Sequence, residues 1–261
     1  MSRHTRIVVW LVVSALAMGA TLLAPRISQD PSYHRFADHR SWLGIPNAAD
    51  VLSNLAFCAI GAGGLRRILP LGRAELARAL PWVVLFASLC LTGLGSGYYH
   101  WAPDNQRLVW DRLPMTFVFV SLLSVAISDR INQRLGFYLE FVLVAVGALS
   151  VWYWQYTESA GRGDLRPYGF VQFYPALGIL LLFLLFPGDL RSAANWAIAA
   201  GWYALAKLFE YEDAAVFAVT GWVSGHTLKH LAAALAAYFI YRIWRREALA
   251  ASPPPGRGRG S

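Results

Sequence analysis

The sequence contains eight apolar stretches of the length that an α-helix needs to cross a hydrocarbon core of about 30 Å, roughly 17 to 25 residues. Charged residues, proline or glycine bound each stretch. A chain in lipid must satisfy its backbone polar groups internally, which a helix does within one segment. The stretches are residues 7–24, 47–65, 79–98, 112–128, 136–156, 169–187, 193–211 and 222–244. The sequence therefore predicts an all-α, polytopic membrane protein with eight transmembrane spans.

The composition supports this class of protein. Hydrophobic residues make up 57% of the chain and charged residues only 15%, whereas a soluble domain carries roughly a quarter charged residues. The net charge of +8 is explained by arginine in the loops. Fourteen arginines fall in the tails and loops on the side of the two termini and seven on the other side. We therefore expect both termini in the cytoplasm and no nucleic-acid partner.

The two ends of the chain differ from its middle. Arg3 and Arg6 before an apolar core also resemble a secretory signal, but Arg26 follows without a small-x-small cleavage site. This favours an uncleaved helix over residues 1–26. Residues 247–261, with a Pro-Pro-Pro run and a Gly-Arg-Gly-Arg-Gly run, offer little apolar surface to bury, and we expect a disordered tail.

Three of the six histidines fall at positions that suit a metal site. His226 and His230 are four residues apart near the outer end of the last stretch, so a helix places both rings on one face. His100 closes the third stretch on the same outer side. Three histidines with water as fourth ligand are typical of catalytic zinc sites. The alternative is that each histidine only contacts a neighbouring helix. His34 and His39 lie in a polar loop and are better explained as exposed histidines.

Two further residues suit hydrolytic chemistry near such a metal. Asp111, which opens the fourth stretch, could orient a zinc-bound water and accept its proton. Ser96 lies four residues before His100 and shares its helical face. The alternatives are that Asp111 pairs with the helix dipole or with Arg112 or Arg107, and that Ser96 bonds back to its own helix.

Other polar residues interrupt the apolar stretches, which is costly unless they pair or face a cavity. Lys207 and Glu210 are three residues apart, and we expect them to pair along one helix. Asp50, Ser53 and Asn54 open the second stretch on the outer side, where they either brace the metal site or cap the helix.

The motifs that carry these residues resemble the alkaline ceramidase family. They are Ser-Asn at 53–54, Ser-Gly-Tyr-Tyr-His at 96–100, Asp-Arg-Leu-Pro-Met at 111–115 and His-Thr-Leu-Lys-His at 226–230. The family belongs to a superfamily of membrane hydrolases that also includes the adiponectin and progestin receptors. The resemblance covers residues 33–246. It implies a ceramidase-like seven-helix domain over residues 27–246, preceded by one extra N-terminal helix.

The resemblance also implies a site and a reaction. Zinc would be held by His100, His226 and His230, with Asp111 positioning or deprotonating the zinc-bound water and Ser96 stabilising the oxyanion. The implied enzyme is a hydrolase of linear amide C–N bonds in sphingolipid metabolism. It would cleave a ceramide-like N-acyl lipid into a fatty acid and an amino-alcohol base, at a site facing the outer side of the membrane.

The sequence departs from the animal and yeast members before the second stretch. Those members bind calcium through a run of acidic residues, whereas residues 38–47 here are shorter and much less acidic. The resemblance therefore does not extend to calcium binding. Two other functions remain open at this point. One is a lipid-sensing, receptor-like protein with a structural zinc, and the other is an electron carrier with haem held by His100 and a histidine of the last stretch.

Overall fold

The computed structural model describes residues 1–251, with side chains as far as Arg246, and this part of the chain is all-helical. The helices are α1 (Arg3–Leu23), η1 (Pro31–His34), α2 (Ala48–Ser53), α3 (Leu55–Ile68), α4 (Arg73–Arg78), α5 (Leu80–Trp101), α6 (Asn105–Arg130), α7 (Gln133–Ser159), α8 (Arg166–Leu185), α9 (Leu190–Tyr211), α10 (Asp213–Thr220) and α11 (Gly225–Ala251). We expected a disordered tail from residue 247, but helix α11 continues to Ala251. Residues 252–261 lie outside the described part.

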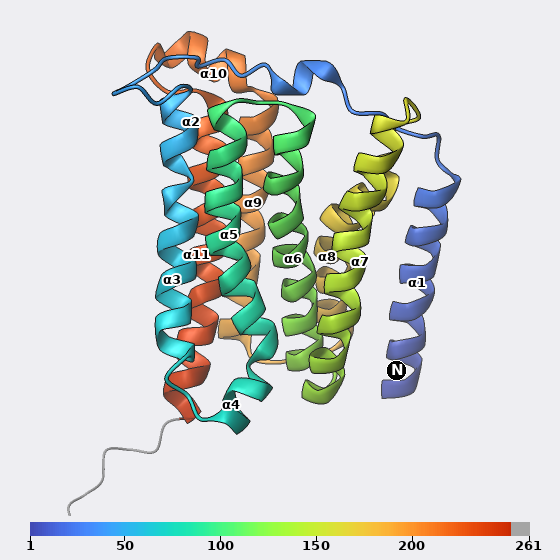
Figure 1. The fold of residues 1–261 in the computed structure, drawn as a ribbon. Helices are drawn as coiled ribbons and strands as arrows, with labels where there is room; N and C mark the ends of the chain where they lie inside the picture. The colour runs from blue at the N-terminus through green and yellow to red at the C-terminus, as the bar shows by residue number, and fades with distance from the viewer. Residues whose placement is uncertain (252–261) are drawn as a thin grey trace, which may run out of the picture.

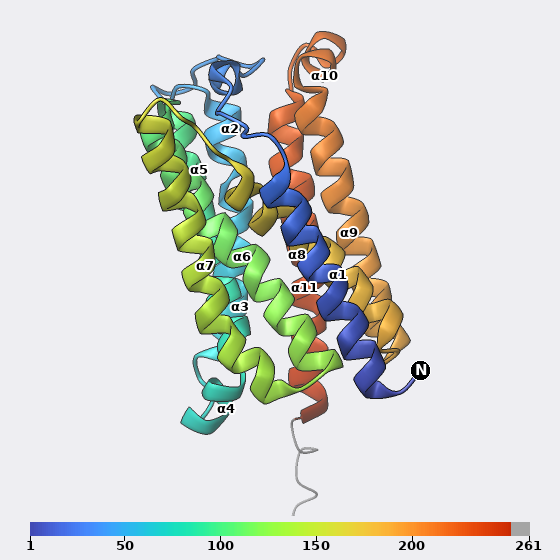
Figure 2. The same ribbon diagram turned by 90° about the vertical axis from the view of Figure 1, so that its right-hand side faces the viewer.

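The long helices run side by side as a bundle (Figure 1). The short helix α10 and the segment between α1 and α2 cover one end of the bundle, which we call the α10 end. The start of α1, the helix α4 and the last turn of α11 lie at the opposite end (Figures 1 and 2). Helix α1 packs on the outside of the bundle against α8.

Six helical segments within the described residues are long and apolar enough to cross a membrane. They are Arg3–Leu23, Ala48–Ile68, Leu80–Trp101, Asn105–Arg130, Gln133–Ser159 and Arg166–Leu185. The fold is therefore that of a helical membrane protein. Helices α9 and α11 correspond to the last two predicted stretches and are of similar length, but they are not among these six. Their assignment as spans stays a prediction.

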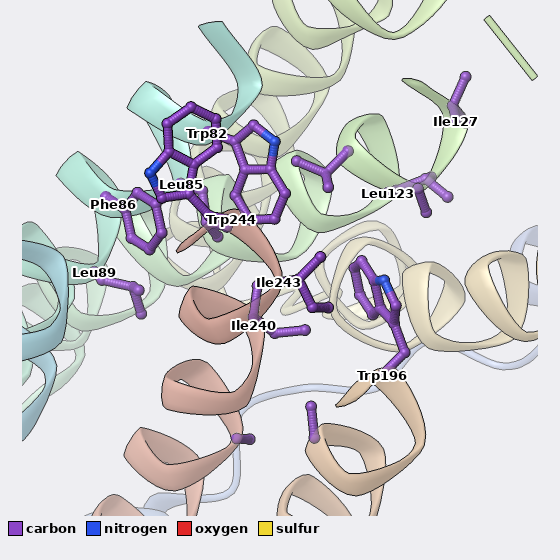
Figure 3. Packing of buried hydrophobic residues seen from close by; sticks show 14 of the residues in the cluster. Trp82, Leu85, Phe86, Leu89, Leu123, Ile127, Trp196, Ile240, Ile243 and Trp244 are labelled. Carbon is purple, nitrogen blue, oxygen red and sulfur yellow. The ribbon is translucent and has the colours of Figure 1, made fainter. Parts of the chain in front are cut away.

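The largest hydrophobic cluster fills the bundle away from the α10 end (Figure 3). Trp82 and Phe86 of α5 stack with ring centroids 6.0 Å apart, and the ring centroids of Trp82 and of Trp244 in α11 are 5.6 Å apart. Gly64 of α3 lets the helices approach here, because a Cβ at this position would overlap the Phe86 ring. The other labelled residues of the cluster are Leu85, Leu89, Leu123, Ile127, Trp196, Ile240 and Ile243.

Helix α6 begins earlier than the sequence predicted. Its first turns are polar, and Asp104 caps the helix by accepting a hydrogen bond from the Arg107 backbone N–H, 2.7 Å away. Pro114 therefore lies inside the helix, whereas the predicted stretch 112–128 would place it near the helix start. A proline there leaves the Trp110 carbonyl without its helical donor. Gly95 of α5 packs against that carbonyl, where a Cβ would overlap the oxygen.

Candidate metal centre

The three predicted histidine ligands meet at the α10 end of the bundle. His100 is the penultimate residue of α5, and His226 and His230 occupy the first two turns of α11. Each has one ring nitrogen within 4.8 Å of those of the other two. All three side chains are buried, with 1%, 5% and 3% of their surface exposed. The helices thus bring together the trio that the sequence singled out.

The geometry of the trio fits a bound metal ion. The Nε2 atoms of His100 and His226 are 3.2 Å apart. Two ligands of a tetrahedral ion with metal–nitrogen bonds of about 2.0–2.1 Å are separated by about 3.3 Å. Three buried imidazoles without a thiolate are a donor set that suits zinc, among other transition metals. The cluster can therefore hold a metal ion, and its identity as zinc belongs to the proposal below.

The same packing argues against haem. The ring centroids of the three histidines lie 4.7–4.9 Å from one another, with the rings edge to face. Axial haem ligands stand on opposite faces of the porphyrin, and these rings leave no space for a porphyrin between any two of them. The Phe36 ring also packs on both His100 and His226, at centroid distances of 4.6 and 4.5 Å. Phe36, from the segment that covers the α10 end, closes this side of the cluster.

Ser53 fixes the orientation of one histidine. Its hydroxyl donates to the Asp50 carbonyl at 3.0 Å and lies 2.8 Å from His230 Nδ1. With its proton used in this way, the hydroxyl oxygen accepts from the Nδ1–H of His230, which leaves Nε2 free to bind a metal. Of the two roles expected for Ser53, the structure shows the bracing one. The break between α2 and α3 at Asn54 places this side chain beside α11.

A second set of hydrogen bonds holds the start of α11 in place. The Asp213 carboxylate accepts from the His226 backbone N–H at 2.7 Å and from the Ala37 backbone N–H at 2.9 Å. Asp50 accepts from the hydroxyl of Thr227 at 2.6 Å. These bonds tie α10, the segment that carries Phe36, and α2 to the helix that carries two of the histidines.

Ser96 and Asp111 reach the same cavity as His230. Both are buried, with 3% and 6% of their surface exposed, and both line this cavity of about 380 Å³. The contact of Gly95 with the Trp110 carbonyl brings α5 and α6 together directly beside these two residues. Most of the remaining wall is apolar and comes from α5, α6, α8, α9 and α11. The cavity thus has a polar end at Ser96, Asp111 and His230, and a long apolar part.

Two lysines and a glutamate form a partly buried ion cluster beside the histidines. The predicted pair of Lys207 and Glu210 is confirmed, with Nζ and Oε2 2.5 Å apart. Lys229 of α11 joins it across the helices at 2.7 Å from Glu210 Oε1, and its Nζ also lies 3.4 Å from His226 Nε2. No partner for Lys229 was predicted from the sequence. The signal for its place beside the metal cluster was its position in the sequence between His226 and His230.

The two loop histidines are not part of the metal cluster. His34 is hydrogen-bonded to the Tyr99 hydroxyl at 2.9 Å and to Asn105 Oδ1 at 3.0 Å, so it fastens η1 to the ends of α5 and α6. His39 lies in the same covering segment. His39 is exposed, as the sequence predicted, whereas His34 is partly buried by its contacts and is not the exposed histidine that was expected.

In comparisons with protein-family models and with curated proteins, no match to the chain is found. The case for a function therefore rests on the site and on the motifs that form it.

Proposed function

We propose that the protein is a zinc-dependent, integral-membrane hydrolase that cleaves the amide bond of a ceramide-like N-acyl lipid. The observation that carries the proposal is the cluster of three histidines, one of which, His230, lines the same largely apolar cavity as Ser96 and Asp111. The resemblance of the four motifs to alkaline ceramidases points to the same reaction. The arginine distribution favours eight spans, both termini in the cytoplasm and a site facing the outer side.

The cavity suits a substrate with one polar bond and a long alkyl chain. Residues such as Leu85, Phe119 and Ile240 line its apolar part, and the polar side chains gather at one end. An acyl chain in the apolar part would place its carbonyl carbon at the polar end. Membrane lipids have direct access to a bundle of spanning helices, so the substrate need not pass through water.

The side chains at the polar end can divide the steps of amide hydrolysis. A zinc ion held by the histidines would lower the pKa of a water toward about 7 and polarise the carbonyl. Asp111 would take the proton from the attacking water and return it to the amide nitrogen as the C–N bond breaks. The Ser96 hydroxyl would donate a hydrogen bond to the carbonyl oxygen as negative charge develops on it. The products are a fatty acid and an amine.

The test compares wild-type protein with Asp111→Asn on a panel of N-acyl lipids, with fatty acid release measured by mass spectrometry and zinc content by elemental analysis. We expect the variant to keep its zinc and to lose about 100-fold or more of the rate, the range of a general base. Asp129→Asn is the matched control, because it makes the same change at the far end of α6. If zinc-loaded wild type binds but cleaves none of these lipids, the receptor-like alternative replaces the hydrolase.

A further inference from the structure

Arg112 is a buried cation without a matching anion. Its side chain is 4% exposed, and only its Nη2 has a hydrogen-bond partner, the Gln29 Oε1 at 2.6 Å. Its Nε and Nη1 have none. Among the described side chains, no carboxylate forms an ion pair with it. Burial of an unpaired charge is strongly unfavourable, so such a group is expected to have a partner when the protein works.

Three aromatic rings surround this guanidinium. Its Cζ lies 4.2 Å from the ring centroid of Trp154, 4.7 Å from that of Tyr168 and 5.4 Å from that of Tyr33. Cation–π contacts stabilise the charge, but the N–H groups in the guanidinium plane still need acceptors. The rings therefore hold Arg112 in one place, and two of its nitrogen atoms remain without a hydrogen-bond acceptor.

Arg112 lines a second cavity, of about 780 Å³, formed mainly by α1, α8, α9 and the segment after α1. The other cations on its wall already have carboxylate partners. Arg166 pairs with Asp164 at 2.7 Å, and Lys207 pairs with Glu210. The remaining carboxylate on the wall, Asp30, is exposed and caps η1 by accepting from the Ser32 backbone N–H. Arg112 is thus the cation on this wall that has no carboxylate partner.

We propose that this second cavity binds a membrane amphiphile with an oxyanion head group, a phosphate or a carboxylate, and that Arg112 Nε and Nη1 donate hydrogen bonds to it. Guanidinium groups favour these oxyanions because the hydrogen bonds are charge-assisted. A lipid is favoured over a free anion because α1 and α8 contribute apolar walls, among them Ala17, Phe170 and Leu177. The site requires neither the metal nor hydrolysis. Gln172 and Lys207 line both cavities, so the bound lipid lies next to the metal site.

The test measures the thermal stability of the purified full-length protein in an uncharged detergent. Dodecyl phosphate, dodecanoate, the uncharged monododecanoyl glycerol and inorganic phosphate are each titrated. We expect the two anionic amphiphiles to raise the melting temperature and the other two to leave it unchanged at equal concentration. In Arg112→Gln the apparent Kd for dodecyl phosphate should weaken by about tenfold or more. Arg107→Gln is the matched control, because it removes the same charge from outside this cavity.

Each result decides the proposal. Equal responses of wild type to the charged and uncharged amphiphiles would overturn it, even if Arg112→Gln fails to fold. A response to inorganic phosphate alone would overturn the choice of a lipid. The same titration on His226→Ala separates this proposal from the hydrolase, since binding at Arg112 should persist in a protein without metal or turnover.

Discussion

Helices α5 and α11 each carry two different environments along their length. At the α10 end they hold His100 and His230 in a buried polar cluster, and further along they hold Phe86 and Trp244 in the largest hydrophobic cluster. The two regions belong to the same pair of helices, so helix propensity and apolar content do not explain the difference. It comes from what each residue meets on the neighbouring helices.

The comparison shows two ways of using burial. The hydrophobic cluster depends on shape, since Gly64 fits against the Phe86 ring and little polar chemistry is involved. The polar cluster depends on hydrogen bonds, such as the one that Ser53 forms with His230. Not every polar atom in it has a hydrogen-bond partner, because His100 Nδ1 and Asp50 Oδ2 have none. Buried polar atoms without partners lower stability, and proteins retain them chiefly where function requires them. We therefore expect mutations to separate function from stability along these two helices.

The largest expected effect is at the metal cluster. His226→Ala should lose stoichiometric zinc, measured by elemental analysis, and with it any turnover, because two imidazoles do not make a zinc site. Phe86→Ala is the paired variant in the hydrophobic cluster. It should keep its zinc but lose about 3 kcal/mol of unfolding free energy, because it leaves a cavity. If His226→Ala still bound zinc fully, the histidine cluster would not be the metal site, and its contrast with the hydrophobic cluster would fail.

A smaller effect is expected where the polar cluster is braced. Ser53→Ala removes the partner of His230 Nδ1 without touching a ligand. Loss of such an outer partner typically weakens metal affinity by about 10- to 100-fold. Competition with a zinc chelator measures this change, and Ser53→Thr, which keeps a hydroxyl, should restore most of the affinity. Unchanged zinc affinity in Ser53→Ala would show that the hydrogen bond does not orient the ligand.

The sequence predicted the parts of this arrangement that depend on one helix at a time. Apolar length indicated the long helices, and the four-residue spacing of His226 and His230 indicated a shared face. The expected pairing of Lys207 with Glu210 is also local, at three residues along α9. Each of these follows from the period of the helix, which the sequence displays directly.

Contacts between helices could not be predicted in the same way. Lys229 joins Glu210 from another helix, and the aromatic rings around Arg112 come from three different segments. The start of α6 was missed because its first turns are polar and its cap, Asp104, lies outside the apolar stretch. Only the packed bundle brings such residues together.

The smallest expected effect concerns the end of α1 nearer the α10 end, where α1 packs against α8 (Figure 2). Arg166 donates to the carbonyls of Leu22 and Ala24 at 2.6 and 2.7 Å, and its ion pair with Asp164 orients it. The hydrogen bond from Arg166 lowers the pKa of Asp164 from 3.8 to about 2. Because the folded-state pKa lies below the unfolded one, this contribution is present above pH 3.8 and is lost as the pH falls through about 2.

Asp164→Asn should therefore destabilise the protein by about 1 kcal/mol at neutral pH and make it less sensitive to acid between about pH 4 and pH 2. Unfolding measured across this pH range for the variant and for Phe86→Ala provides the comparison. Phe86→Ala should keep the acid sensitivity of the wild type, because it changes no titrating group. If the Asp164→Asn and wild-type profiles ran parallel, the ion pair would not contribute to folding, and the attachment of α1 would depend on its apolar contacts with α8 alone.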